Sequence, residues 1–104
     1  MEYKVKFTEQ CLEDIENICE YITEKLKEIN ASNNLIIKIM KLTENLIKNP
    51  KMYVQIDKSD KLKRKYRKIV INNYILLYTI DNKENVIYIS HLYYFGRNYL
   101  QGLI

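Results

Sequence analysis

The sequence is poor in the residues that interrupt regular structure or build metal centres. Its 104 residues include no tryptophan, one proline, two glycines, two cysteines and one histidine. With 47% hydrophobic residues, this composition excludes a disordered chain and indicates a globular one. No apolar run approaches the ~20 residues of a membrane helix, and the N-terminus lacks a signal-peptide pattern. We therefore expect one cytoplasmic domain over residues 1–104.

The two cysteines and the histidine are not spaced like the ligands of a metal. Cys11 and Cys19 fall in one expected helix, roughly 12 Å apart along its axis at 1.5 Å per residue, which is too far for a disulfide. His91 is distant from both in the sequence, and no CxxC or HxxxH spacing occurs. We expect two reduced thiols that are buried or half-buried, no metal and no cofactor.

Hydrophobic periodicity divides the chain into six elements in the order β-α-α-β-β-β. Alternation predicts a first strand over Tyr3–Phe7. Apolar residues at helical spacing predict two amphipathic helices between Thr8 and Asn49, joined by a polar connection over 29–33. Three further strands are expected, at Lys65–Asn72, Tyr74–Ile80 and Val86–Tyr93. The predicted fold class is α+β, an antiparallel sheet packed on one face by a helical hairpin.

Positive charge is concentrated just before the second expected strand. Residues 58–68 hold seven basic side chains and one acid, whereas the whole chain has a net charge of only +4. Local positive charge marks a place where a phosphate or an acidic partner can be held. A solvated basic loop would have the same composition. Lys65 and Arg67, however, continue into a strand, and arginines on neighbouring strands can converge on one phosphate.

The segments Tyr66–Tyr78 and Val86–Leu100 resemble the RelE/ParE superfamily of bacterial toxins. The resemblance rests on an arginine that opens the first hairpin strand, two tyrosines four residues apart in the central strand, and a final strand that runs into the corner Gly96-Arg97-Asn98-Tyr99. The element order also matches over the whole chain. The resemblance implies a toxin of a type II toxin-antitoxin system, held silent in a hetero-oligomer by an antitoxin whose C-terminal segment wraps it.

Two activities are implied by the resemblance. ParE-like toxins inhibit DNA gyrase and need no nuclease site. RelE-like toxins are metal-independent endoribonucleases that cut mRNA on the ribosome, where basic groups hold the phosphate and an acid and a base move protons. Under the second activity the catalytic residues would be Arg67, Arg97, Tyr94 and, as an alternative acid or base, His91. Under either, the candidates for holding the target or a phosphate are Lys63, Arg64, Lys65, Arg67 and Arg97.

One departure from the pattern favours the first activity. RelE-like ribonucleases usually carry an arginine directly after the first tyrosine of the central strand, whereas here Ile75 follows Tyr74. One residue that would bind the phosphate is thus missing, so gyrase inhibition is slightly preferred over mRNA cleavage. A third hypothesis is a non-toxic adaptor that only binds an antitoxin-like peptide.

Overall fold

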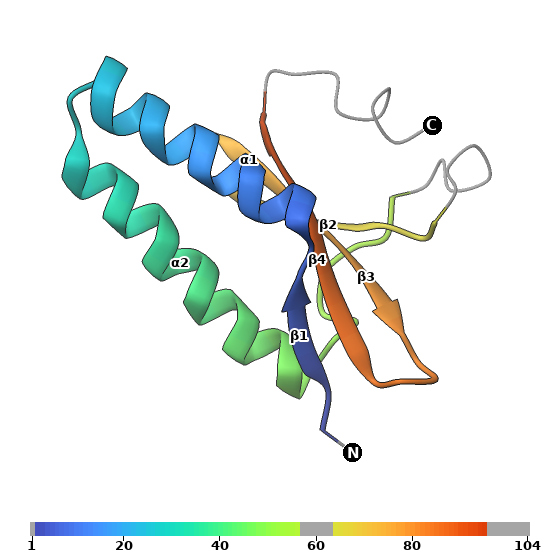
Figure 1. The fold of residues 1–104 in the computed structure, drawn as a ribbon. Helices are drawn as coiled ribbons and strands as arrows, with labels where there is room; N and C mark the ends of the chain where they lie inside the picture. The colour runs from blue at the N-terminus through green and yellow to red at the C-terminus, as the bar shows by residue number, and fades with distance from the viewer. Residues whose placement is uncertain (1, 57–63, 96–104) are drawn as a thin grey trace.

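The fold is a four-stranded sheet with a helical hairpin on one face, as seen in a computed structural model that describes residues 2–56 and 64–95 (Figure 1). The strand order is β1-β4-β3-β2, with β1 parallel to β4 and the other neighbours antiparallel. The elements are β1 (Lys4–Phe7), α1 (Glu9–Glu20), the π-helical turn η1 (Tyr21–Lys25), α2 (Ile29–Lys48), β2 (Arg67–Ile71), β3 (Tyr74–Asp81) and β4 (Val86–Tyr94). The predicted α+β class and element order are confirmed, while the sheet is mixed rather than wholly antiparallel.

The helical hairpin differs from its prediction at the connection. Thr8 caps α1, since its hydroxyl accepts a 3.1 Å hydrogen bond from the N–H of Cys11. The predicted connection over 29–33 is wrong, because α2 already begins at Ile29. The chain reverses earlier, through η1 and through Lys27, whose φ is 57°. Packing of Ser32 and Leu35 into the interior outweighs the weak helix propensity of the asparagines and serine in this stretch.

The sheet has an apolar core on each face. The main core lies between the sheet and the helices and includes the fully buried Leu46, Leu76 and Tyr78. On the opposite face a smaller cluster covers the central strands, formed by Ile56, Tyr66, Ile75, Leu77 and Tyr93. β3 is therefore covered on both of its faces, and the loop after α2 supplies part of the second cover through Ile56.

The tight β2–β3 turn is formed by two asparagines, Asn72 and Asn73. Asn72 has a φ of 52°, a left-handed conformation that asparagine tolerates better than most residues. Cys11 is completely buried, Cys19 is half-buried, and both thiols are free. Across residues 2–56 and 64–95, no helix combines the length and the apolar character needed to cross a membrane.

Candidate functional site

A pocket with basic walls opens where β2 begins and β3 ends. It has a volume of about 190 Å³. Three segments form its walls. The loop after α2 supplies Lys51 and Gln55, and the chain around the start of β2 supplies Lys65 and Arg67. The end of β3 and the turn that follows it supply Ile80 and Asn82. We call this the basic pocket.

Strand register explains why these distant segments meet. The two-residue turn at Asn72-Asn73 folds β2 back on β3, so Arg67 lies opposite Tyr78 and the start of β2 lies beside the end of β3. The loop after α2 is fastened to the same place, because the Tyr78 hydroxyl donates a 2.7 Å hydrogen bond to the carbonyl of Pro50. Gln55 also forms an antiparallel bridge with Arg67.

Arg67 both holds the loop after α2 in place and lines the basic pocket. Its Nη1 donates to the carbonyl oxygen of Tyr53 at 2.6 Å and approaches that of Lys51 at 3.5 Å. A guanidinium has five N–H donors, so Nη1 can hold the loop while the other nitrogens remain for a ligand. Burial raises the pKa of the neighbouring Tyr78, and the positive charge of Arg67 acts in the opposite direction.

A second hollow adjoins the basic pocket and extends to the β3–β4 turn. It has a volume of about 420 Å³, shares Lys65, Ile80 and Asn82 with the basic pocket, and adds Arg64 and Lys83 together with the acidic Asp81. Arg64 and Lys65 are both exposed. Lys65 therefore stands between two hollows and can reach a ligand in either.

The basic pocket has the chemistry of an anion site. Lys51, Lys65 and Arg67 supply positive charge, Gln55 and Asn82 supply amides, and no acidic side chain is among the described residues that line the pocket. Such a set holds a phosphate or a carboxylate by charge-assisted hydrogen bonds. The described lining contains no histidine, carboxylate, tyrosine or cysteine, so its composition suits binding rather than proton transfer.

Tyr94 lies away from the basic pocket. It is paired with Tyr74 at the far end of β3, whereas Arg67 is paired with Tyr78. Four residues of strand separate the two pairs, or about 13 Å. The Tyr94 side chain is exposed, and its ring contacts that of Tyr74 edge-on with centroids 6.1 Å apart. Tyr94 therefore does not share a pocket with Arg67.

His91 lies on the opposite face of the sheet from Arg67. It is paired with Leu77, whose side chain belongs to the smaller core, whereas Tyr78 belongs to the main core. The imidazole stacks on Tyr93 with centroids 5.4 Å apart and contacts Tyr66 edge-on. Burial lowers the pKa of His91, with the Asp14 carboxylate acting in the opposite direction.

The sequence-predicted site residues are thus only partly assembled by the described structure. Lys65 and Arg67 meet in the basic pocket, and Arg64 lies in the adjoining hollow. Lys63 and Arg97 lie outside the described residues. Within residues 2–56 and 64–95, no group of three or more His, Cys, Asp and Glu side chains could hold a metal ion.

Sequence reasoning missed Lys51, Gln55 and Asn82. The position of Asn82 could have been predicted from the hairpin turn. A two-residue turn at 72–73 places the β3–β4 turn, which contains Asn82, beside the segment that precedes β2. Lys51 and Gln55 had no comparable signal, because their position depends on the hydrogen bonds that Pro50 and Tyr53 accept.

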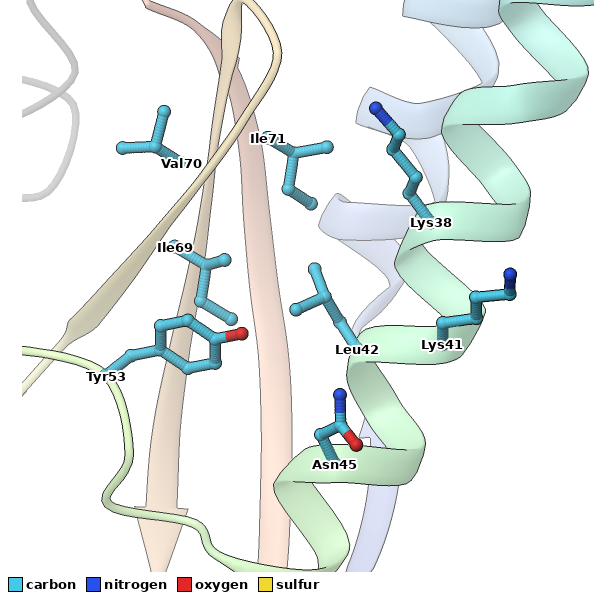
Figure 2. A pocket seen from close by; sticks show the side chains of 8 residues that line it. All are labelled: Lys38, Lys41, Leu42, Asn45, Tyr53, Ile69, Val70 and Ile71. Atoms are coloured by element: carbon cyan, nitrogen blue, oxygen red, sulfur yellow. The ribbon is translucent and has the colours of Figure 1, made fainter.

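A separate apolar groove runs between α2 and β2. Its volume is about 300 Å³, and it is lined by Lys38, Lys41, Leu42, Asn45, Tyr53, Ile69, Val70 and Ile71. Figure 2 shows Ile69 and Ile71 pointing toward α2 and Leu42 pointing back toward them, with the two lysines along the helix side. We call this the α2–β2 groove. It would suit an apolar segment that also carries negative charge.

The groove adjoins an open sheet edge. The loop after α2 pairs with the first half of β2, since Lys68 N–H donates to Val54 O at 3.1 Å and Ile56 N–H to Tyr66 O at 2.9 Å. Backbone direction alternates along a strand, so the N–H and carbonyl of Val70 point outward like those of Lys68. Among the described residues, no strand lies beyond β2 at this point. The edge there can accept another strand.

Comparisons with known proteins converge on one superfamily. A family model described as the ParE toxin of a type II toxin-antitoxin system, parDE, matches residues 5–99. No curated protein matches the chain by sequence.

Three solved structures share the fold at low sequence identity. A chain of a chromosomal ParDE system from P. aeruginosa has a TM-score of 0.68 and 11% identity, covering 88% of this chain and 95% of its own. A chain of the RelBE2 toxin-antitoxin complex from Mycobacterium tuberculosis has a TM-score of 0.60 and 17% identity, covering 90% and 99%. A mutant of E. coli toxin RelE in the free state has a TM-score of 0.59 and 16% identity, covering 99% and 94%.

Proposed function

The chain belongs to the ParE toxin family of type II toxin-antitoxin systems, and we propose that it is a growth-inhibiting toxin that acts in the cytoplasm by binding DNA gyrase. The composition of the basic pocket is the observation that favours gyrase as the target. Its cations and amides can hold an anionic group, while Tyr94 and His91 lie elsewhere on the sheet. This arrangement supports inhibition by binding, which requires no proton transfer.

In this proposal the target binds to the basic pocket and the adjoining hollow. Lys51 and Lys65 are exposed and attract an acidic side chain or a phosphate, and Arg67 adds a directional donor from a position fixed by its bonds to the loop. Arg64 extends the surface into the adjoining hollow. Lys63 and Arg97 remain proposed contributors, on the basis of the sequence resemblance.

The alternative function is ribosome-dependent cleavage of mRNA. The same cations would hold the scissile phosphate, and the likeness in fold to a RelE toxin favours this candidate. The 2′-hydroxyl attack would then need an acid and a base, with Tyr94 and His91 in those roles. Since neither lies at the basic pocket, this function would require the RNA to extend across the sheet.

The proposed protein partner is a cognate antitoxin, and its proposed docking place is the α2–β2 groove. Solved relatives of this fold include a toxin-antitoxin complex. An antitoxin segment could pair with the backbone of Val70 and place apolar side chains against Leu42 and Ile69. Acidic side chains of that segment would meet Lys38 and Lys41. The toxin would then form a hetero-oligomer with its inhibitor.

Induced expression tests the function and the target together. We expect the wild-type chain to stop growth with an early loss of DNA synthesis, and purified chain to inhibit gyrase supercoiling. A Lys51→Ala, Lys65→Ala double variant should lose at least tenfold in toxicity, since each charge-assisted hydrogen bond contributes about 1.5–3 kcal/mol. The matched control is Lys4→Ala, Lys25→Ala, which removes two exposed lysines outside the pocket.

Three outcomes would contradict parts of this proposal. An early block in protein synthesis, with mRNA cut only on ribosomes and gyrase unaffected, would replace gyrase by the ribosome as the target. Full toxicity of the Lys51, Lys65 double variant would remove the basic pocket from the mechanism. Harmless expression of a chain that still binds its antitoxin would support the adaptor hypothesis instead.

A further inference from the structure

Ser90 forms a bulge in β4. Leu77 of β3 pairs with His91, whereas the next residue, Tyr78, pairs with Ile89. Ser90 is therefore left without a paired residue on β3. Bulges of this kind re-aim neighbouring side chains and are over-represented beside functional sites. The bulge at Ser90 directly precedes the only histidine of the chain.

α1 fastens the main chain on both sides of His91. The hydroxyl of Thr8, the N-cap of α1, donates a 3.1 Å hydrogen bond to the carbonyl of Ser90. The N–H of Leu92 donates a 3.1 Å hydrogen bond to the carboxylate of Asp14, which lies in α1. The backbone that carries His91 is thus held in place by a helix.

The Ser90 hydroxyl joins the imidazole of His91 to the main chain. Its Oγ lies 3.2 Å from the carbonyl oxygen of Leu77 and 2.9 Å from Nδ1 of His91, and Ser90 is only 8% exposed. A carbonyl oxygen has no proton to donate, so the single hydroxyl proton goes to Leu77 and Oγ accepts the Nδ1–H of His91. A neutral imidazole carries one N–H, so the lone pair is on Nε2.

Nε2 of His91 is open to solvent. Across residues 2–56 and 64–95, no side-chain nitrogen or oxygen is both buried and without a hydrogen-bond partner. Nδ1 has its partner in Ser90, and Nε2 has none in this part of the chain, so Nε2 must reach the surface. Burial lowers the pKa of His91 more than the Asp14 carboxylate raises it, so the imidazole is uncharged at neutral pH and its exposed lone pair can accept a proton.

Neighbouring rings hold the imidazole in one orientation. It stacks on Tyr93 and meets Tyr66 edge-on. Tyr94 lacks such support, because its side chain is exposed and no hydrogen bond from the described residues orients its hydroxyl. Of the two candidate acid–base residues, only His91 therefore has a proton-accepting atom held in a fixed place.

His91 also shares a face of the sheet with the second hollow. Side chains alternate along a strand, so Leu77 and Thr79 of β3 point to the same face. His91 pairs with Leu77, and Thr79 lines the hollow together with Arg64 and Lys65. Two residues of strand, about 7 Å, separate the two positions. An anion held by these two cations can therefore lie on the same face as Nε2.

We propose that Ser90 is a positioning residue that holds His91 as its Nδ1–H tautomer and leaves Nε2 as an exposed proton acceptor, suited to a ligand's hydroxyl group, on the face of the sheet opposite the helices. The inference goes beyond gyrase binding, which requires no proton acceptor. It deepens the alternative function, because it assigns the base to His91 rather than to Tyr94. The tautomer can be measured whether or not the chain is toxic, so its failure is distinct from failure of the proposed function.

The ring nitrogens of His91 report the tautomer directly, because the chain has no other histidine. In a long-range proton–nitrogen NMR spectrum at a pH well above 6.5, we expect wild type to show the proton on Nδ1. Ser90→Ala removes the acceptor for that proton, so the Nδ1–H form should fall from nearly all to less than about half of the molecules. Ser90→Thr keeps the hydroxyl and should keep the wild-type tautomer. So should the control Thr43→Ala, which removes a hydroxyl that donates to the Met40 carbonyl on α2.

Diethyl pyrocarbonate, which acylates a neutral imidazole nitrogen, tests the exposure of Nε2. It should modify His91 in the folded wild-type chain at neutral pH, and modification only after denaturation would overturn the assignment of Nε2 as an accessible acceptor. A wild-type spectrum with the proton on Nε2, or an unchanged tautomer in Ser90→Ala, would overturn the role of Ser90. The wild-type spectrum and the pyrocarbonate reaction decide the proposal even if Ser90→Ala does not fold.

Discussion

The guanidinium of Arg67 and the main-chain carbonyl of Tyr53 are joined by a 2.6 Å hydrogen bond from Nη1. This bond links the first residue of β2 to the loop that follows α2, and the same loop supplies Lys51 and Gln55 to the basic pocket. Arg67 therefore contributes to the pocket twice, as a donor in its wall and as the residue that positions two of its neighbours.

Arg67→Ala should lower the free energy of unfolding by about 1–3 kcal/mol, because it removes a hydrogen bond from a charged group and leaves the Tyr53 carbonyl unpaired. Lys65→Ala, which removes an exposed side chain, should change it by less than about 0.5 kcal/mol. Urea denaturation measures both. Equal free energies of unfolding in the two variants would show that Arg67 does not stabilise the loop after α2. This measurement also tells whether a loss of toxicity in Arg67→Ala comes from a lost target contact or from lower stability.

Arg97→Ala and Tyr94→Phe separate binding from catalysis. If the proposed gyrase inhibition holds, Arg97→Ala should reduce target binding about ten- to a hundredfold through the loss of charge-assisted hydrogen bonds, while Tyr94→Phe should have little effect, since no proton moves. Colony counts and separate labelling of DNA and protein synthesis measure this. A loss of 10²–10⁴-fold in Tyr94→Phe would instead indicate an acid or base.

Val70→Pro tests strand addition at the open edge of β2. Proline removes the outward N–H that no described strand uses, so antitoxin binding should weaken about two- to tenfold, the effect of one hydrogen bond. Val70→Ala is the control, because it shortens the side chain and keeps the N–H. Calorimetric titration with the antitoxin compares them, and equal losses in both variants would argue for side-chain contact alone.

The thiol of Cys11 should be inert in the folded chain. Burial, with a smaller contribution from the Asp14 carboxylate, raises its pKa to about 12, so almost no thiolate exists at neutral pH. In a Cys19→Ser variant, iodoacetamide should label Cys11 only after denaturation. Rapid labelling of that variant without denaturant would contradict the burial of Cys11.

His91 should make stability fall as the pH drops below about 6.5. Burial lowers its pKa from 6.5 in the folded state, so in this range the unfolded chain binds a proton that the folded chain does not, and the free energy of unfolding decreases. Above pH 6.5 this contribution is constant. His91 is the only histidine, and His91→Gln should therefore flatten the unfolding free energy as the pH falls below about 6.5. The same slope in that variant would assign the effect to another group.

The sequence alone determined the element order and the faces of the elements. Alternating and helical spacings separate buried from exposed positions, and turn residues such as Asn72 act locally. It also located the basic run that contains Lys65 and Arg67, and it predicted the family through the hairpin tyrosines Tyr74 and Tyr78. These features depend on neighbours within a few residues, which is why one sequence suffices for them.

Tertiary structure decided how distant segments combine. The parallel pairing of β1 with β4, the early start of α2 and the joining of Lys51 with Arg67 depend on contacts between residues far apart in the chain. The same holds for the separation of His91 from Arg67 on opposite faces of the sheet, where the irregular register between Leu77 and Tyr78 shifts the β3–β4 pairing. Spacing fixes which residues share a face of one element, but only packing between elements determines which faces meet.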